Sequence, residues 1–199
     1  MKLYYKPGAC SLASHIALRE IGADFGIEKV DTARGVTETG ADFRAVNPLG
    51  YVPALALADG DVITEGPAIL QFIADSAPES GLAPAAGTRA RTKLQSLLNF
   101  IGTELHGAFG VFFRGAGDEA AKARLNARMD RFDAMLADGR AFLTGETFTV
   151  ADAYAFVVAS WTRPLKIDLS RWPHVAAFVE RVAARPAVQA AMKAEGLLG

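Results

Sequence analysis

The sequence has few of the residues on which redox pairs and metal sites depend. Its 199 residues include one cysteine, Cys10, and three histidines that are scattered along the chain. A Cys-x-x-Cys dithiol is excluded, because Ala13 stands where the second cysteine would be. Histidines without ligand spacing argue against a metalloenzyme. Any thiol chemistry at Cys10 would therefore need a thiol from outside the chain.

Other absences narrow the class of protein further. The formal net charge is −1, from 21 Lys and Arg against 22 Asp and Glu, so the basic surface of a nucleic-acid-binding protein is missing. Neither phosphate-loop pattern occurs. No apolar run approaches the length of a membrane span, and the N-terminus lacks the apolar core of a signal peptide. With one unpaired cysteine, these absences predict a cytoplasmic protein that binds neither nucleic acid nor membrane.

Hydrophobic residues make up 51% of the chain, which is enough for a substantial core. Periodicity and turn signals predict the order βαβαββα over residues 1–76, with a mixed four-stranded sheet and a polar, irregular stretch from Asp31 to Asp42. Residues 77–87 are rich in Pro, Gly, Ala and Ser and are interpreted as a linker. Strand signals then disappear, and residues 88–199 are predicted to be all-helical, with a capping box from Thr149 to Asp152.

The stretch from Tyr4 to Ser11 places Cys10 where a strand passes into a helix. Pro7-Gly8 is a turn signal, and helical periodicity begins at Ser11. The unpaired amides and the positive dipole at a helix N-terminus favour an anion, so we predict that Cys10 is biased toward thiolate or stabilises the thiolate of a partner. The alternative is that this lone cysteine is simply a small buried hydrophobic residue.

Several further motifs resemble one known family when they are taken in order. They are Lys6-Pro7-Gly8-Ala9-Cys10-Ser11, Asn47-Pro48-Leu49-Gly50-Tyr51-Val52-Pro53, Thr64-Glu65-Gly66-Pro67-Ala68-Ile69, Glu104-Leu105-His106 and Phe148-Thr149-Val150-Ala151-Asp152. Their order and spacing resemble the cytosolic glutathione transferases, in particular the bacterial beta class, from Met1 to Gly199. The resemblance implies a thioredoxin-like, glutathione-binding domain followed by an all-helical domain that carries the electrophile site.

Two of these motifs suit the tripeptide glutathione, which the resemblance implies as co-substrate. If the Val52-Pro53 bond is cis, the amide and carbonyl of Val52 are free to pair with the cysteinyl backbone of the ligand, as an added strand would. Glu65 and Gly66 suit the γ-glutamyl end, with the Gly66 amide for its carboxylate and the Glu65 carboxylate for its ammonium. The plainer alternatives are an edge-strand proline and an acidic partner of the helix dipole.

Two polar side chains of the helical half are also candidates. Asn99 and His106 lie two turns apart and are expected on one helix face. The resemblance places this face across the cleft from Cys10, where Asn99 could hydrogen-bond the ligand and His106 could donate to or polarise a thiolate. Glu104 resembles a position that reaches the γ-glutamyl amine in a neighbouring subunit, which implies a homodimer. The alternative is a solvated helix surface.

The sequence departs from the beta-class pattern at two positions. That pattern usually has a lysine near position 35 that contacts the glycyl carboxylate, whereas this chain has Gly35 preceded by Arg34. Either Arg34 substitutes for the lysine or the contact is missing. Gly66 likewise lacks the serine hydroxyl of many relatives.

The resemblance implies an enzyme that conjugates the glutathione thiolate to hydrophobic electrophiles without a metal, for example in detoxification. Cys10 adds a second route through a mixed disulfide with glutathione, which would give glutaredoxin-like reduction or reductive dehalogenation. A non-catalytic glutathione- or ligand-binding protein on the same fold is the third reading. The electrophile pocket is expected near Ala9, Phe109, Phe112, Phe113 and residues 161–167.

Overall fold

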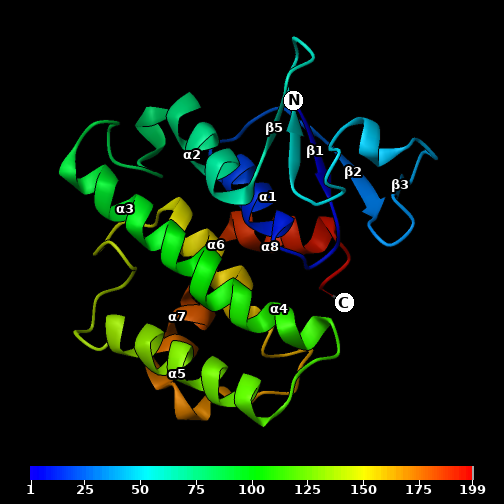
Figure 1. Cartoon of the computed structure of the whole chain (residues 1–199). Coiled ribbons are helices and arrows are strands. Elements are labelled where there is room, and N and C mark those ends of the chain that lie inside the picture. Colours follow the sequence, from blue (N-terminus) through cyan, green and yellow to red (C-terminus); the bar gives the residue numbers. More distant parts are fainter. Residues whose placement is uncertain (199) are drawn as a thin grey trace. The chain divides into compact units, whose positions relative to one another are not determined.

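The computed structural model describes residues 1–198, which form two compact units (Figure 1). Unit 1 consists of Met1–Ser80 and Arg185–Gly199, and unit 2 of Gly81–Ala184. The predicted linker, residues 77–87, is divided between the two units. The predicted helical domain is shorter in the structure than expected, because its last segment belongs to unit 1.

Unit 1 is built on a five-stranded sheet, where the sequence predicted four strands. Its strands are β1 (Lys2–Tyr5), β2 (Gly26–Asp31), β3 (Val36–Thr37), β4 (Ala54–Ala56) and β5 (Val62–Thr64), in the order β3-β2-β1-β4-β5. The β1–β2 pair is parallel and the other pairs are antiparallel, so the sheet is mixed as predicted. The added strand lies in the polar stretch that was expected to be irregular.

A tight turn after β2 explains this added strand. The Gly35 amide donates to the Asp31 carbonyl at 2.8 Å, and the Asp31 side chain accepts from the amides of Ala33 and Arg34. The chain therefore reverses at once, and Val30 pairs with Thr37 in the ladder. Polar composition alone concealed a strand of two residues, because side-chain alternation cannot be detected over so short a length.

The described part of unit 1 also contains three helices and two short turns. They are α1 (Ser11–Glu20), α2 (Gly66–Ser76) and α8 (Pro186–Ala194), with short 3₁₀ turns η1 (Phe43–Ala45) and η2 (Pro78–Ser80). The second helix of the predicted βαβαββα order is therefore only the 3₁₀ turn η1. Helix α1 is the centre of the packing, because both α2 and α8 lie against it and eight of its ten residues are buried.

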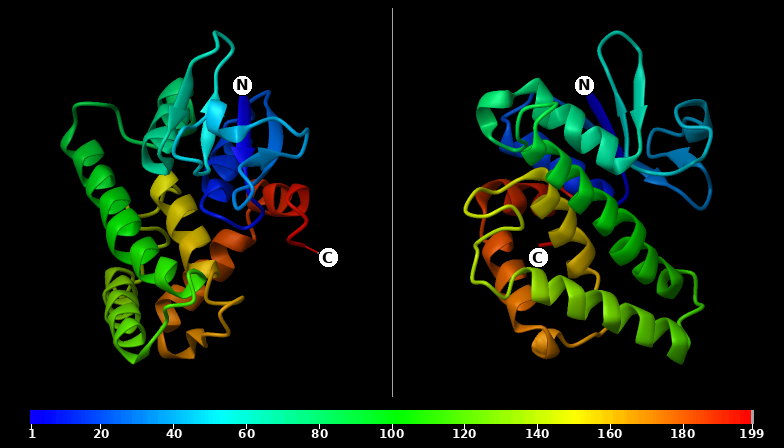
Figure 2. Two further views of the ribbon diagram at one scale, coloured as in Figure 1. Left: turned by 45° about the vertical axis from the view of Figure 1, so that its right-hand side comes forward. Right: turned by 60° about the vertical axis from the view of Figure 1, so that its left-hand side comes forward.

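The return of the chain to unit 1 is fixed by polar contacts as well as by packing. Arg185 forms a bidentate ion pair with Glu20, through Nε and Nη2 at 2.7 and 2.9 Å. Figure 2 shows the red C-terminal helix beside the blue first helix. Residues 165 positions apart meet here, and local periodicity gives no signal for such a contact.

Unit 2 contains only helices and their connections. These are α3 (Arg89–Phe100), the π-helical segment η3 (Ile101–His106), α4 (Gly107–Phe113), α5 (Glu119–Met135), α6 (Val150–Ser160), η4 (Leu169–Arg171) and α7 (Pro173–Ala183). Helix α6 is almost entirely buried, and the predicted capping box at its start is present. The Asp152 carboxylate accepts from the Thr149 amide at 2.8 Å and from the Leu143 amide at 2.7 Å. Within residues 1–198, no helix is long and apolar enough to cross a membrane.

Candidate functional site

Cys10 is the N-cap residue of α1, as the sequence predicted. Its half-buried thiol lies 3.3 Å from the Val52 carbonyl oxygen, to which the S–H donates. Burial raises the pKa of the Cys10 thiol to about 11, although the backbone amides of Cys10 and Ser11 act in the opposite direction. The prediction of a thiolate is therefore wrong for the free protein, because the desolvation of the sulfur outweighs the helix-terminal amides. At neutral pH the group is a thiol.

The loop before Cys10 is held in place by two separate contacts. Ser11 Oγ accepts from the Lys6 amide at 3.1 Å, which closes the loop on itself. Glu195, at the end of α8, accepts from the Gly8 amide at 3.0 Å. These contacts fix the backbone on the N-terminal side of the cysteine.

Glu195 belongs to a buried chain of hydrogen bonds that the sequence did not reveal. Its other carboxylate oxygen lies 3.0 Å from His15 Nδ1, and both side chains are fully buried. Arg19 Nε donates to His15 Nε2 at 3.4 Å, so Nδ1 carries the proton that faces the carboxylate. His15 is structural, as expected from the sequence. A glutamate 180 positions away leaves no local pattern by which it could have been found.

The peptide bond between Val52 and Pro53 is cis, one of the two alternatives that the sequence left open. Within residues 1–198 the Val52 amide has no hydrogen-bond partner, so it is available to a ligand. The prediction of a free carbonyl needs correction, because that oxygen already accepts from the Cys10 thiol. The preceding loop is fixed by Asn47, whose Nδ2 donates to the Tyr51 carbonyl at 2.8 Å.

Glu65 and Gly66 stand at the start of α2. Glu65 is exposed and has φ 67°, a left-handed conformation that is uncommon for a residue with a side chain. Its side chain makes no capping bond, and its negative charge contributes to the raised pKa of Cys10. A Cβ added at Gly66 would lie 3.8 Å from Pro53 Cγ, so the helix start lies directly beside the Val52-Pro53 bond.

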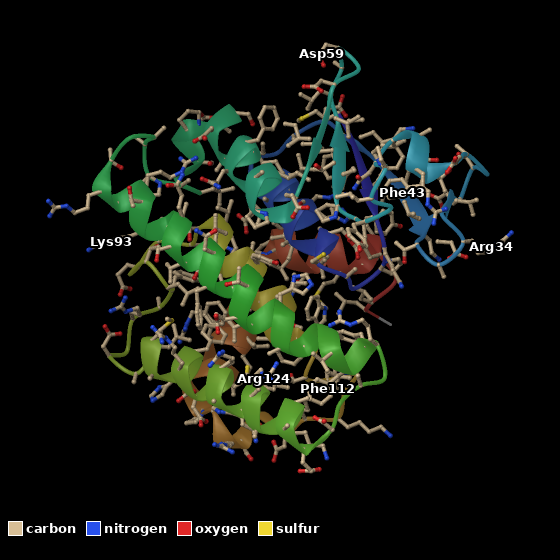
Figure 3. The ribbon with its side chains drawn as sticks, viewed as in Figure 1. Arg34, Phe43, Asp59, Lys93, Phe112 and Arg124 are labelled. Atoms are coloured by element: carbon tan, nitrogen blue, oxygen red, sulfur yellow. The ribbon has the colours of Figure 1, made fainter. Side chains whose placement is uncertain are left out.

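Arg34 lies at the tip of the turn between β2 and β3. Its side chain is exposed, and Figure 3 shows it pointing outward at the right edge of the view. The next residue, Gly35, is buried and has φ 71°. A lysine at this position would be strained, because side chains disfavour this left-handed conformation.

The predicted pair Asn99 and His106 is separated by the π-helical segment η3. A π-helix has i→i+5 bonds and more residues per turn than an α-helix, so a spacing of seven no longer places two residues on one face. Asn99 is exposed and His106 is half-buried. The expectation of one shared face is therefore wrong. π-Helical segments are frequent at functional sites, and this one includes both Glu104 and His106.

His106 packs within an aromatic cluster of unit 2. Its Nδ1 lies 2.7 Å from Tyr154 Oη, and its ring centroid lies 4.8 Å from that of Trp161. Phe109 and Phe113 also pack against Trp161, with centroids 6.0 and 5.4 Å away. Burial lowers the pKa of His106, so the imidazole is neutral at pH 7. The cluster includes several of the aromatic residues from which an electrophile pocket was expected.

Glu104 and Phe112, two other residues that were expected at the site, contact residues of their own unit. Glu104 is partly exposed and forms an ion pair with Arg128 of the same unit. Phe112, labelled in Figure 3, packs over Gly117, where any added side chain would collide with its ring. Within residues 1–198, no three His, Cys, Asp or Glu side chains are grouped so that they could hold a metal ion.

Comparisons with known proteins show the family to which the chain belongs. The family models described as "Glutathione S-transferase, N-terminal domain" and "Glutathione S-transferase, C-terminal domain" match residues 8–76 and 102–186. Glutathione S-transferase GstA of Escherichia coli O157:H7 is 46% identical over 201 residues, which cover 99% of this chain and 100% of that protein. The chain therefore belongs to the glutathione S-transferase family.

Solved structures narrow the assignment. A bacterial beta-class glutathione S-transferase from Sphingomonas chungbukensis has a TM-score of 0.95 and 47% identity, with 100% of both chains covered. A sphingomonad glutathione S-transferase in complex with glutathione has a TM-score of 0.93 and 50% identity, covering 99% of this chain and 100% of that one. Within the family, the chain is a beta-class enzyme, as its motifs predicted.

Proposed function

We propose that this protein transfers glutathione to hydrophobic electrophiles, with glutathione bound along Val52 in unit 1. The observation that carries the proposal is the 3.3 Å contact between Cys10 Sγ and the Val52 carbonyl. It puts a thiol beside the backbone group that would pair with the cysteinyl residue of the ligand. The sulfur of glutathione would then lie close to Cys10.

The Val52 amide and the start of α2 give the ligand its orientation. The unpartnered Val52 amide donates to the cysteinyl carbonyl of glutathione. The Gly66 amide, at the positive end of α2, binds the γ-glutamyl carboxylate, and the exposed Glu65 carboxylate binds the ammonium. Each charged group of the γ-glutamyl end therefore meets a group of opposite charge or polarity.

The raised pKa of Cys10 suggests how the sulfur is activated. A thiol with a pKa of about 11 is protonated at pH 7, so Cys10 serves as a hydrogen-bond donor to the glutathione thiolate when its S–H turns away from the Val52 carbonyl on ligand binding. Glutathione loses its proton to solvent, and its sulfur then forms a bond to the electrophilic carbon while the leaving group departs with its electron pair. Cys10 itself forms no bond in this reaction.

For unit 2 we propose that His106 acts on the substrate as a neutral donor. A phenol is a stronger acid than a neutral imidazole N–H, so Tyr154 donates to Nδ1 and the proton is carried by Nε2. Within residues 1–198, Nε2 has no hydrogen-bond partner. It is available to donate to a sulfur or to a leaving group.

Thiol exchange at Cys10 is the second candidate function. It is favoured by the partial exposure of a thiol that has no disulfide partner. In this route, the Cys10 thiolate attacks glutathione disulfide, which forms a Cys10–glutathione disulfide and releases one glutathione thiolate. A pKa of about 11 leaves only a small thiolate fraction at pH 7, so conjugation is the primary proposal.

The two roles of Cys10 are separated by comparing Cys10→Ser and Cys10→Ala. Glutathione-dependent turnover of a chromogenic aryl halide measures conjugation, and reduction of a glutathione mixed disulfide measures exchange. We expect Cys10→Ser to keep most of the conjugation and Cys10→Ala to lose on the order of 10²-fold, as when an oxyanion-hole donor is removed. Both variants should lose exchange. Equal conjugation in all three proteins would exclude Cys10 as the donor.

The remaining proposals concern assembly and location. We propose a cytoplasmic homodimer in which Glu104 and Asn99 help to bind glutathione. Glu104 is already paired with Arg128, so the ammonium of the ligand has to compete for its carboxylate. Sedimentation equilibrium of the intact protein measures the number of subunits.

A further inference from the structure

Arg44 occupies the space in which a side chain at position 35 would begin. A Cβ added to Gly35 would lie 2.6 Å from Arg44 Nη1 and 3.2 Å from Arg44 Cζ, and real Cβ atoms are not found so close to another atom. A side chain at position 35 would therefore require the Arg44 guanidinium to move. In this chain the glycine provides room for an arginine that reaches in from another segment.

The backbone of Arg44 is firmly held, whereas its side chain is exposed. The residue lies in the 3₁₀ turn η1, whose N-cap residue Asp42 accepts from the Arg44 amide at 2.9 Å. Its neighbour Phe43 is fully buried, with its ring centroid 5.5 Å from that of Tyr4. The Phe43 amide also donates to the Gly35 carbonyl at 2.9 Å, which ties η1 to the turn that Arg44 covers.

Within residues 1–198, the Arg44 guanidinium has no ion-pair partner. The nearest carboxylate along the chain, that of Asp42, uses one oxygen to cap η1. An arginine whose backbone is held in a hydrogen-bonded turn and whose guanidinium lacks a carboxylate partner offers its planar donors to a carboxylate from outside the chain.

Two close approaches place Arg44 relative to the ligand backbone. Arg44 Nε lies 4.0 Å from the position of a Cβ on Gly50, on the N-terminal side of Val52. Gly66 approaches Pro53, on the C-terminal side. A tripeptide that is held at Val52 and has its γ-glutamyl end at Gly66 therefore directs its glycyl end toward Gly50 and Arg44.

We propose that Arg44 binds the glycyl carboxylate of glutathione in place of the lysine that is absent at Gly35. This proposal rests on the proposed function, since it assigns one more contact to the same ligand. Arg34 does not take this role, because it lies at the outer tip of the turn and its side chain points away (Figure 3).

The test measures the dissociation constants of two ligands by calorimetry. Glutathione has the glycyl carboxylate, and γ-glutamylcysteine lacks the glycine. For Arg44→Ala we expect about a tenfold rise in the glutathione dissociation constant, as for a charge-assisted hydrogen bond, and less than about a twofold change for γ-glutamylcysteine. Unchanged binding of γ-glutamylcysteine also shows that the variant is folded. Arg34→Ala is the matched control and should change neither constant.

Failures of the two proposals can be told apart. If the unmodified protein does not bind glutathione, the proposed function itself fails. If it binds glutathione but Arg44→Ala weakens both ligands equally or neither ligand, the assignment of Arg44 is overturned while the proposed function stands. A selective loss of glutathione binding in Arg34→Ala would also overturn it.

Discussion

Burial shifts the pKa of Cys10 in unit 1 and the pKa of His106 in unit 2 in opposite directions, and both side chains are left uncharged. Burial raises the pKa of the thiol, whose charged form is the base, and lowers the pKa of the imidazole, whose charged form is the acid. Both side chains are therefore neutral at pH 7. Because Cys10 and His106 are both uncharged before the substrate binds, each is suited to donate a hydrogen bond to a charge that arrives with the substrate.

The two residues differ in what holds them. The loop of Cys10 depends on the charged Glu195, which meets it from the far end of the sequence. His106 depends on the neutral hydroxyl of Tyr154, which lies on α6 of the same unit. Interactions with a buried charge are stronger than those between neutral groups, so the comparison predicts a larger effect when the support of Cys10 is removed.

The largest expected effect is that of Glu195→Ala. The change removes the acceptor of a buried hydrogen bond from His15 and of a partly buried one from Gly8, and should lower the free energy of unfolding by about 3 kcal/mol. Urea denaturation measures it. Lys193→Ala, an exposed residue of the same helix, is the control and should stay within about 0.5 kcal/mol. If both variants lost the same free energy of unfolding, the hydrogen bonds of the Glu195 carboxylate would not be the cause.

The next effect concerns the neutral state of Cys10 and is measured by alkylation with iodoacetamide from pH 6 to 10. Only the thiolate reacts, and the pKa rises from 9.0 to about 11, so the thiolate fraction at pH 7 should be about 100-fold below that of an ordinary cysteine. The rate should climb about tenfold per pH unit up to pH 10 without levelling. Free glutathione in the same series is the control. A plateau at or below pH 9 would contradict the raised pKa.

The smallest effect is expected for Tyr154→Phe. It removes one neutral hydrogen bond from His106 and should lower the free energy of unfolding by about 1 kcal/mol. The specific readout is the tautomer of His106, followed by nitrogen chemical shifts of the ring. Loss of the Tyr154 donor should reduce the share of the Nε2–H form, and Tyr4→Phe serves as a control in unit 1. An unchanged tautomer ratio would mean that Tyr154 does not set it.

Features that depend on neighbouring residues could be predicted from the sequence. The capping box at Thr149 and the helix start at Cys10 are of this kind, because a few adjacent residue types determine each backbone conformation. The order of motifs also identified the family. These local features predicted which helix, strand or loop carries most of the candidate site residues.

The features that were missed depend on contacts or on small changes of geometry. Nothing near His15 indicates that Glu195 will reach it, and nothing near Gly35 indicates that Arg44 will cover it. The π-helical segment before Gly107 changes which residues share a face, although the apolar periodicity still predicts a helix. The charge state of Cys10 was predicted wrongly, because a helix terminus is visible in a sequence and the extent of burial is not.

The division of unit 1 into two stretches of sequence has a consequence for how the protein is made. Residues 185–198 leave the ribosome only after the whole of unit 2 has been synthesised. Until then, His15 lacks its glutamate and α1 lacks the helix that covers it. We therefore expect the N-terminal half of the nascent chain to expose apolar surface during translation, and such surface is bound by chaperones.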